Sequence, residues 1–203
     1  HCGAGASYGA FISPLGHIPA RVHAISQQMK QEVDPGRYAP FILQCGHAGM
    51  KTGEDGPTHA DPQALQLHLE NYVPGTAATL TPWEPQESWP LVAAAFRGEF
   101  AVIVPFVTRP SEPVLDRAGL GLAPASAAAR GVYWLREATG EPDVTLVLQG
   151  SGVTLAFVQD TLPRLLDDGI APEVVYVASP ELFDRLPEAE RAATFDASRA
   201  DRA

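Results

Sequence analysis

A polar, glycine-containing loop between His47 and His59 carries the densest set of chemically active side chains in the sequence. Glu54, Asp55 and a lysine lie between these two histidines. Imidazoles move protons near neutral pH, and carboxylates orient hydroxyl groups. A zinc site is disfavoured, because the two histidines are twelve residues apart with no third histidine in the loop and no CxxC motif nearby. Two interpretations remain: a ligand-binding loop, or a solvated loop whose Asp55 and Thr58 form local turns.

Two apolar segments are expected to position this loop. Phe41–Gln44 comes directly before it, and residues 100–107 form the most continuous apolar run, so both are predicted to be buried strands. In open α/β sheets, ligands bind at the carboxyl ends of parallel strands. The loop and Arg109, which follows the second strand, are therefore expected at one sheet edge. From the pattern alone, Arg109 either binds an anion or is simply exposed.

The helix after the loop has clear start signals. Asp61 is expected as its N-cap, with Pro62 in the first turn. Leu65, Leu69 and Tyr72 recur at helical spacing and predict one apolar face. The loop should therefore lead into a capped helix that packs on the sheet.

Strands and helices alternate along the rest of the chain. Further strands are predicted at residues 77–81, 144–148 and 174–177, and further helices at residues 18–29, 89–96 and 155–165. This alternation predicts the α/β class, with two parallel-sheet units joined near residues 110–140. Gly150-Ser151-Gly152 could cradle a phosphate, but it lacks a third glycine, so a tight strand-to-helix turn is favoured.

Composition excludes several classes of function. Of the 203 residues, 45% are hydrophobic and 19% are charged, which excludes general disorder. Lys and Arg number 14 against 24 Asp and Glu, giving a net charge of −10. This acidic balance argues against nucleic acid or an anionic membrane as partner. The uncharged run at residues 144–159 is broken by Gly150-Ser151-Gly152 and is shorter than the roughly 20 residues that a membrane span needs.

The number of cysteines indicates the cellular compartment, and the first residues indicate whether the sequence is a fragment. Cys2 and Cys45 are too few for a disulfide framework and favour a reducing, cytoplasmic compartment. The sequence opens on His1 within a Gly/Ala pattern and shows no signal peptide. We therefore expect a fragment of a longer chain.

Several motifs together resemble the transketolase family. Gly53–His59 reads GEDGPTH, a specific signature of these thiamine-diphosphate enzymes. Tyr8–Phe11 is similar to the family's YGGTF segment, and Ala129–Leu135 to its ARGGYVL strand. Residues 144–153 and Ser179–Asp184 resemble the opening of the family's C-terminal domain. The resemblance implies a pyrimidine-binding domain at residues 1–136, with a linker from about 110, and part of the C-terminal domain at residues 137–203.

The resemblance also implies roles for individual residues. His59 would contact ketose oxygens near the reacting carbonyl and move protons, so it is the expected catalytic residue. Asp55 would bind a sugar hydroxyl, and His47 and Arg109 would bind the substrate phosphate. Phe11 would pack on the aminopyrimidine of the cofactor.

The implied activity is transfer of a two-carbon ketol unit from a ketose phosphate to an aldose phosphate, as in the pentose phosphate pathway. The implied cofactors are thiamine diphosphate and Mg²⁺ or Ca²⁺, with the metal ligands outside this chain. The cofactor-activating glutamate and the diphosphate-binding domain would also lie upstream, so this chain alone is expected to be inactive. A homodimer is implied, with sugar phosphates as the small-molecule partners.

Two alternatives stay open at this point. Pro14, at a position where the family has an aromatic residue, and Ala48-Gly49, which replace Asp-Ser, favour a thiamine-diphosphate enzyme with a different or unphosphorylated donor. A non-catalytic dimerising module is the alternative from another class. A diphosphate-and-metal motif in the parent reading frame would support the enzyme.

Overall fold

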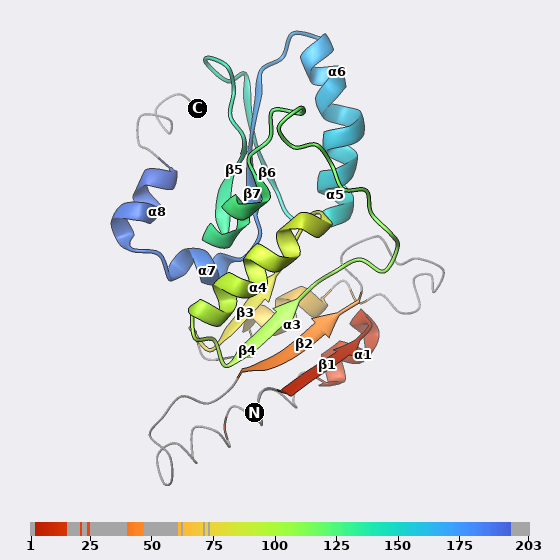
Figure 1. Ribbon diagram of the computed structural model, residues 1–203, viewed down its shortest axis with the longest axis vertical. Helices are drawn as coiled ribbons and strands as arrows, with labels where there is room; N and C mark the ends of the chain where they lie inside the picture. Colours follow the sequence, from red (N-terminus) through yellow and green to blue (C-terminus); the bar gives the residue numbers. More distant parts are fainter. Residues whose placement is uncertain are drawn as a thin grey trace.

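The computed structural model describes residues 3–15, 21, 24, 40–46, 61, 63–70, 72 and 74–195. Within these ranges the chain forms two small sheets that lie towards opposite ends of the view in Figure 1. The α/β class predicted from the sequence is confirmed. Of the predicted helix at residues 18–29, only residues 21 and 24 are described, and both are helical.

The first sheet is entirely parallel. It contains β1 (Gly3–Ser7), β2 (Phe41–Cys45), β3 (Ala77–Leu80) and β4 (Val102–Pro105) in the order β1-β2-β4-β3. β3 and β4 are buried at every position, as expected of strands covered on both faces. The described helices of this unit are α1 (Gly9–Leu15), α3 (Ala64–Glu70), the 3₁₀ turn η2 (Pro85–Glu87) and α4 (Ser88–Arg97).

The second sheet is mixed. It contains β5 (Val132–Arg136), β6 (Val144–Leu148) and β7 (Pro172–Val177) in the order β5-β7-β6. β6 and β7 are parallel, as the alternation predicts, whereas β5 pairs with β7 in the antiparallel direction. The expected domain boundary after residue 136 stays a prediction; β5, which precedes it, is hydrogen-bonded within the second sheet.

Short helices complete the second unit. They are η3 (Ala125–Arg130), α5 (Ser151–Ala156), the π-helical turn η4 (Phe157–Thr161), α6 (Leu162–Asp167), α7 (Pro180–Asp184) and α8 (Glu188–Thr194). α5, η4 and α6 follow one another without a break, as the predicted helix at 155–165 requires. Gly150 has φ of +91° at the turn before α5, so the Gly150-Ser151-Gly152 turn has the expected strand-to-helix geometry.

One hydrophobic core runs through both units. Leu80, Trp83 and Leu91 from the first unit pack in the same buried cluster as Leu135 and Tyr176 from the second. A separate cluster lies against the first sheet and includes residues of α1, β2, α3 and β4. The two sheets are therefore parts of one packed body and are not joined by a loose linker.

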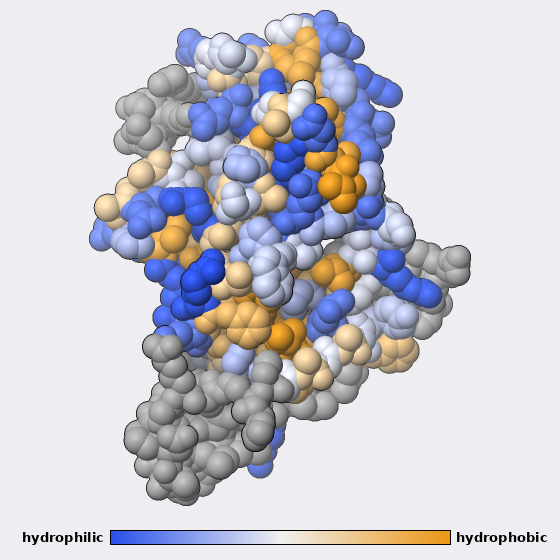
Figure 2. Space-filling model, viewed as in Figure 1, coloured by the Kyte–Doolittle hydropathy of each residue, from blue (hydrophilic) through white to orange (hydrophobic). Residues whose placement is uncertain are grey.

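The surface is mixed in polarity. On the face drawn in Figure 2, polar residues predominate, and apolar residues gather in several separate patches. Within the residues that the structure describes, no helix is long and apolar enough to cross a membrane.

Helix α3 follows the predicted cap but differs in its buried face. The Asp61 carboxylate accepts a hydrogen bond from the Gln63 amide at 2.9 Å, as expected for a helix start. Leu65 is only half-buried, whereas Ala64 and His68 are fully buried. The apolar spacing located this face correctly to within one residue, but it missed the histidine, because a periodic pattern counts only apolar types.

His68 is enclosed by aromatic rings. Its imidazole stacks on Tyr72 at 6.1 Å between ring centroids and meets the edge of Phe106 at 6.2 Å. Neither ring nitrogen has a hydrogen-bond partner among the residues that the structure describes. Burial disfavours the charged imidazolium and lowers the pKa of His68 below its ordinary value.

We predict that His68 makes the fold sensitive to mild acid. Above about pH 6.5 the imidazole is neutral in both the folded and the unfolded chain. Below that pH the unfolded chain binds a proton that the folded chain does not, so the free energy of unfolding falls by at most about 1.4 kcal/mol per pH unit. Urea denaturation at pH 7.5, 6.5 and 5.5 should show this fall in the wild type.

The matched control is His68→Phe, which keeps an aromatic ring in the same cluster and leaves every other titrating group in place. Its stability relative to the wild type should rise as the pH falls. Parallel stability curves for the two proteins would contradict the prediction.

Candidate functional site

Three neighbouring parallel strands end side by side at the carboxyl edge of the first sheet. The Gly46 amide, after β2, donates to the Ser7 carbonyl at the end of β1, at 2.7 Å. The Val107 amide, after β4, donates to the Cys45 carbonyl at 2.9 Å. The residues that follow these strands therefore leave the sheet at one edge, where α/β proteins bind ligands.

Arg109 lies at this edge, as predicted. Its side chain is exposed, and its guanidinium carbon lies 5.6 Å from the centre of the Tyr8 ring. Phe11 lies in the first turn of α1, where its amide donates to the Tyr8 carbonyl at 2.9 Å. The Phe11 side chain is 50% exposed. The structure thus brings Arg109 and Phe11 to one edge, while their roles stay predictions.

The signature loop itself is outside the described residues. His47, Asp55 and His59 all fall there, so the structure tests neither their positions nor their roles. The described chain reaches Gly46 at the carboxyl edge and resumes at Asp61 before α3. Among the described residues, no group of three His, Cys, Asp or Glu side chains could hold a metal ion.

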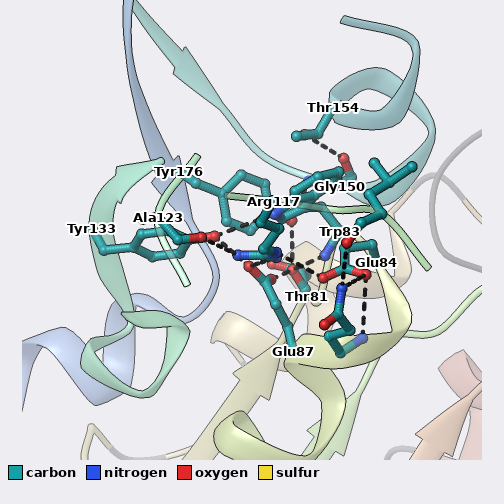
Figure 3. Close-up of polar contacts among 12 residues, drawn as sticks. Thr81, Trp83, Glu84, Glu87, Arg117, Ala123, Tyr133, Gly150, Thr154 and Tyr176 are labelled. Carbon is teal, nitrogen blue, oxygen red and sulfur yellow. Dashed lines mark hydrogen bonds and ion pairs between the residues drawn. The ribbon is translucent and has the colours of Figure 1, made fainter. Parts of the chain in front are cut away.

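A buried ionic cluster lies next to this edge, between the two sheets (Figure 3). Arg117 donates from Nε to Glu84 Oε1 at 2.8 Å and from Nη2 to Glu87 Oε1 at 2.6 Å. Both carboxylates are fully buried, and the arginine side chain is only 5% exposed. The guanidinium also lies over the Trp83 ring, 4.8 Å from its centre, and donates to the Ala123 carbonyl at 3.0 Å.

Neutral donors complete the cluster. The Tyr133 hydroxyl donates to Glu87 Oε1, and the Trp83 amide donates to Glu87 Oε2 at 3.2 Å. The Gln86 amide donates to Glu84 Oε2 at 3.4 Å. Each carboxylate is thereby held by several donors, which is the condition for keeping two buried anions beside one cation.

Burial dominates the electrostatics of this cluster. It raises the pKa of Glu87, an effect opposed by the Arg117 charge and by the hydrogen bond from Tyr133. For Arg117, burial has the largest single effect and would lower the pKa, but the neighbouring acidic groups, Glu87 first among them, together outweigh it, and the net direction is upward. Burial also raises the pKa of Tyr133 well above its ordinary value, so its hydroxyl stays protonated and remains a donor.

The cluster fixes the segment that carries Arg109. This segment leaves β4 at Phe106 and reaches Arg117 before it turns towards the second sheet. Besides the Arg117 contacts, Gln86 Nε2 donates to the Leu115 carbonyl at 3.0 Å, which holds the segment against η2. The sequence analysis did not identify Glu84, Glu87 or Arg117; the detectable signal was a pair of carboxylates beside Trp83 in an otherwise apolar region.

A cavity of about 260 Å³ lies between the residues that follow β3 and those that follow β4. It is lined by residues that follow β3 and β4: Pro82, Glu84, Pro85, Ser88, Val107, Thr108, Pro110, Ser111 and Glu112. Carboxylates in the lining disfavour an anion. This cavity is therefore not suited to a phosphate.

Comparisons with known proteins agree with the sequence motifs. No family model matches the chain. Transketolase 2 of Xanthobacter flavus is 33% identical over 173 residues, which cover 82% of this chain and 23% of that protein. The transketolase of Leishmania mexicana superposes with a TM-score of 0.69 at 22% identity, covering 96% of this chain and 25% of that one.

A third relative is a Pichia stipitis transketolase in complex with sedoheptulose 7-phosphate. It superposes with a TM-score of 0.67 at 22% identity and covers 94% of this chain. The chain spans only 23–25% of the length of these three proteins. The comparisons confirm the resemblance and the fold predicted from the motifs.

We predict that removing the buried cation destabilises the fold strongly. Arg117→Met leaves Glu84 and Glu87 buried without their counter-ion, which costs about 3–5 kcal/mol. Urea denaturation of the chain at pH 7.5 measures this loss.

The control is Arg191→Met, which removes a partly exposed arginine whose Nη1 lies 3.8 Å from Asp184 Oδ1. Its change should stay below about 1 kcal/mol, as for surface pairs in general. Equal losses in the two variants would show that the buried cluster does not hold the units together.

Proposed function

Because the chain belongs to the transketolase family, we propose that it supplies the substrate-facing sheet edge of a thiamine-diphosphate enzyme. In this proposal the enzyme transfers a two-carbon ketol unit from a ketose phosphate to an aldose phosphate. The observation that carries the proposal is the convergence at one carboxyl edge. Tyr8 and Phe11 follow β1, the signature loop begins after β2, and Arg109 follows β4. An exposed cation and a half-exposed aromatic ring therefore lie at the carboxyl edge where β2 ends, and this supports the proposal.

The exposed residues at this edge fit the cofactor that the family implies. Phe11 is half-exposed at the start of α1, where its ring can pack on an aminopyrimidine. When bound, thiamine diphosphate supplies the nucleophilic carbon and the electron sink that ketol transfer requires. We propose that the Mg²⁺ or Ca²⁺ ligands and the glutamate that activates the cofactor come from the part of the enzyme outside this chain.

The signature loop would act on the substrate. His59 would donate and accept protons at the ketose oxygens beside the reacting carbonyl, since imidazole titrates near neutral pH. Asp55 would accept a hydrogen bond from the neighbouring sugar hydroxyl and so orient the acceptor. In this proposal His59 transfers protons and Asp55 positions the substrate.

The phosphate end of the substrate would be held by Arg109 and His47. A guanidinium binds a phosphate through paired N–H donors, with more directional contact than an ammonium group. The Pichia stipitis relative, which was solved with sedoheptulose 7-phosphate, supports a phosphorylated sugar as substrate. A homodimer and a cytoplasmic location belong to the same proposal; the cysteine usage supports the location.

We predict that His59→Ala lowers kcat and kcat/KM by about 100-fold or more in the enzyme assembled with its diphosphate-binding region. The loss follows from removing a positioned acid–base group. Steady-state kinetics with sedoheptulose 7-phosphate measure it, and a circular dichroism melt verifies that the variant is folded. Wild-type kinetics would refute a catalytic role for His59.

We predict that Arg109→Ala raises KM for sedoheptulose 7-phosphate by about 10- to 100-fold, from the loss of a charge-assisted hydrogen bond. KM for unphosphorylated sedoheptulose should change little, because that sugar never used the contact. The control is Arg97→Ala, an exposed arginine at the end of α4, before β4 and so at the opposite edge. An equal loss on both sugars would remove the phosphate role from Arg109.

A further inference from the structure

The Tyr8 side chain crosses the end of β2 and reaches Arg109, which follows β4. Tyr8 comes directly after β1, and β2 lies between β1 and β4 in the sheet. Its ring nevertheless lies under the Arg109 guanidinium, 5.6 Å from ring centre to Cζ. The side chain therefore links the two outer strand ends of this three-strand edge.

Gly46 makes this crossing sterically feasible. It follows β2 directly and lies against the Tyr8 ring. A Cβ at this position would lie 3.3 Å from Tyr8 Cδ1, which is tighter than ordinary contact, and 3.5 Å from the Ser7 carbonyl oxygen, which is ordinary van der Waals contact. Because Gly46 has no side chain, the Tyr8 ring packs against the Gly46 backbone and reaches the Arg109 guanidinium.

We propose that Tyr8 is a positioning residue for the anion-binding function of Arg109; the inference rests on the proposed function. The face of the Tyr8 ring attracts the guanidinium electrostatically. That contact uses the face of the guanidinium, whereas hydrogen bonds to a phosphate use its edge, so the two do not compete. The ring already restricts the conformations of the arginine side chain before a phosphate binds. The side chain therefore loses less conformational entropy on binding.

The proposal assigns the effect to the ring and not to the hydroxyl. Tyr8→Phe keeps the ring and should keep KM for sedoheptulose 7-phosphate near its wild-type value. Tyr8→Leu removes the ring and should raise that KM by about 2- to 5-fold, the strength of an exposed cation–π contact. Both variants should leave kcat, and KM for unphosphorylated sedoheptulose, unchanged.

The experiment measures both sugars on the enzyme assembled with its diphosphate-binding region, for the wild type and for the Phe and Leu variants at position 8. Tyr8→Met, also without a ring, is measured in parallel in case the leucine variant does not fold. The same substitutions are then made in the Arg109→Ala background. Because the ring acts through Arg109, removing it there should have no further effect on KM.

The outcomes separate this inference from the proposed function. If Arg109→Ala leaves KM for the phosphorylated sugar unchanged, the phosphate role of Arg109 itself is refuted. If Arg109→Ala raises that KM but the ringless variants do not, only the role of Tyr8 is overturned. Equal losses in the Phe and Leu variants would assign the effect to the phenol hydroxyl and would also overturn it.

Discussion

The structure depends on one buried guanidinium held between two buried carboxylates. Arg117 comes from the segment after β4, and Glu84 and Glu87 come from the turn after β3. None of the three charges is tolerable in a core without the others, because each would lose its hydration uncompensated. The ion pairs therefore force these segments together, and Tyr133 from β5 joins them through Glu87.

Around that cluster the carboxyl ends of the two sheets meet. The Thr81 amide, just after β3, donates to the Ala178 carbonyl, just after β7, at 2.8 Å, and the Tyr176 hydroxyl donates to the Thr81 carbonyl at 2.5 Å. Within the second unit, Gly131 lets the chain before β5 pack closely on the start of α7: it has φ of +82°, and a Cβ there would lie 2.2 Å from the Ser179 carbonyl oxygen. The second unit therefore packs against and supports the edge of the first sheet at which Arg109 lies.

Rigid support of this kind is what a binding edge requires. A parallel sheet delivers every strand end to the same side, so residues distant in sequence converge without long loops. The side chains at the ends must still be oriented. The cluster fixes the backbone on one side of Arg109, and the Tyr8 ring contacts its guanidinium on the other.

The sequence alone determined the apolar strands, the alternation that defines the α/β class and the motifs of the family, because these depend on local periodicity and on short contiguous signatures. It gave no sign of β1, whose Gly and Ala residues form no apolar run. It also placed Arg109 at a sheet edge, since the end of the strand before it can be located from its apolar run; Phe11 was singled out only through the resemblance. Only the tertiary structure decided which distant residues meet. The pairing of Arg117 with Glu84 and Glu87, the burial of His68, the antiparallel β5 and the Tyr8–Arg109 contact join residues up to 101 positions apart. Contacts of this range arise from packing in three dimensions, and no local pattern records them.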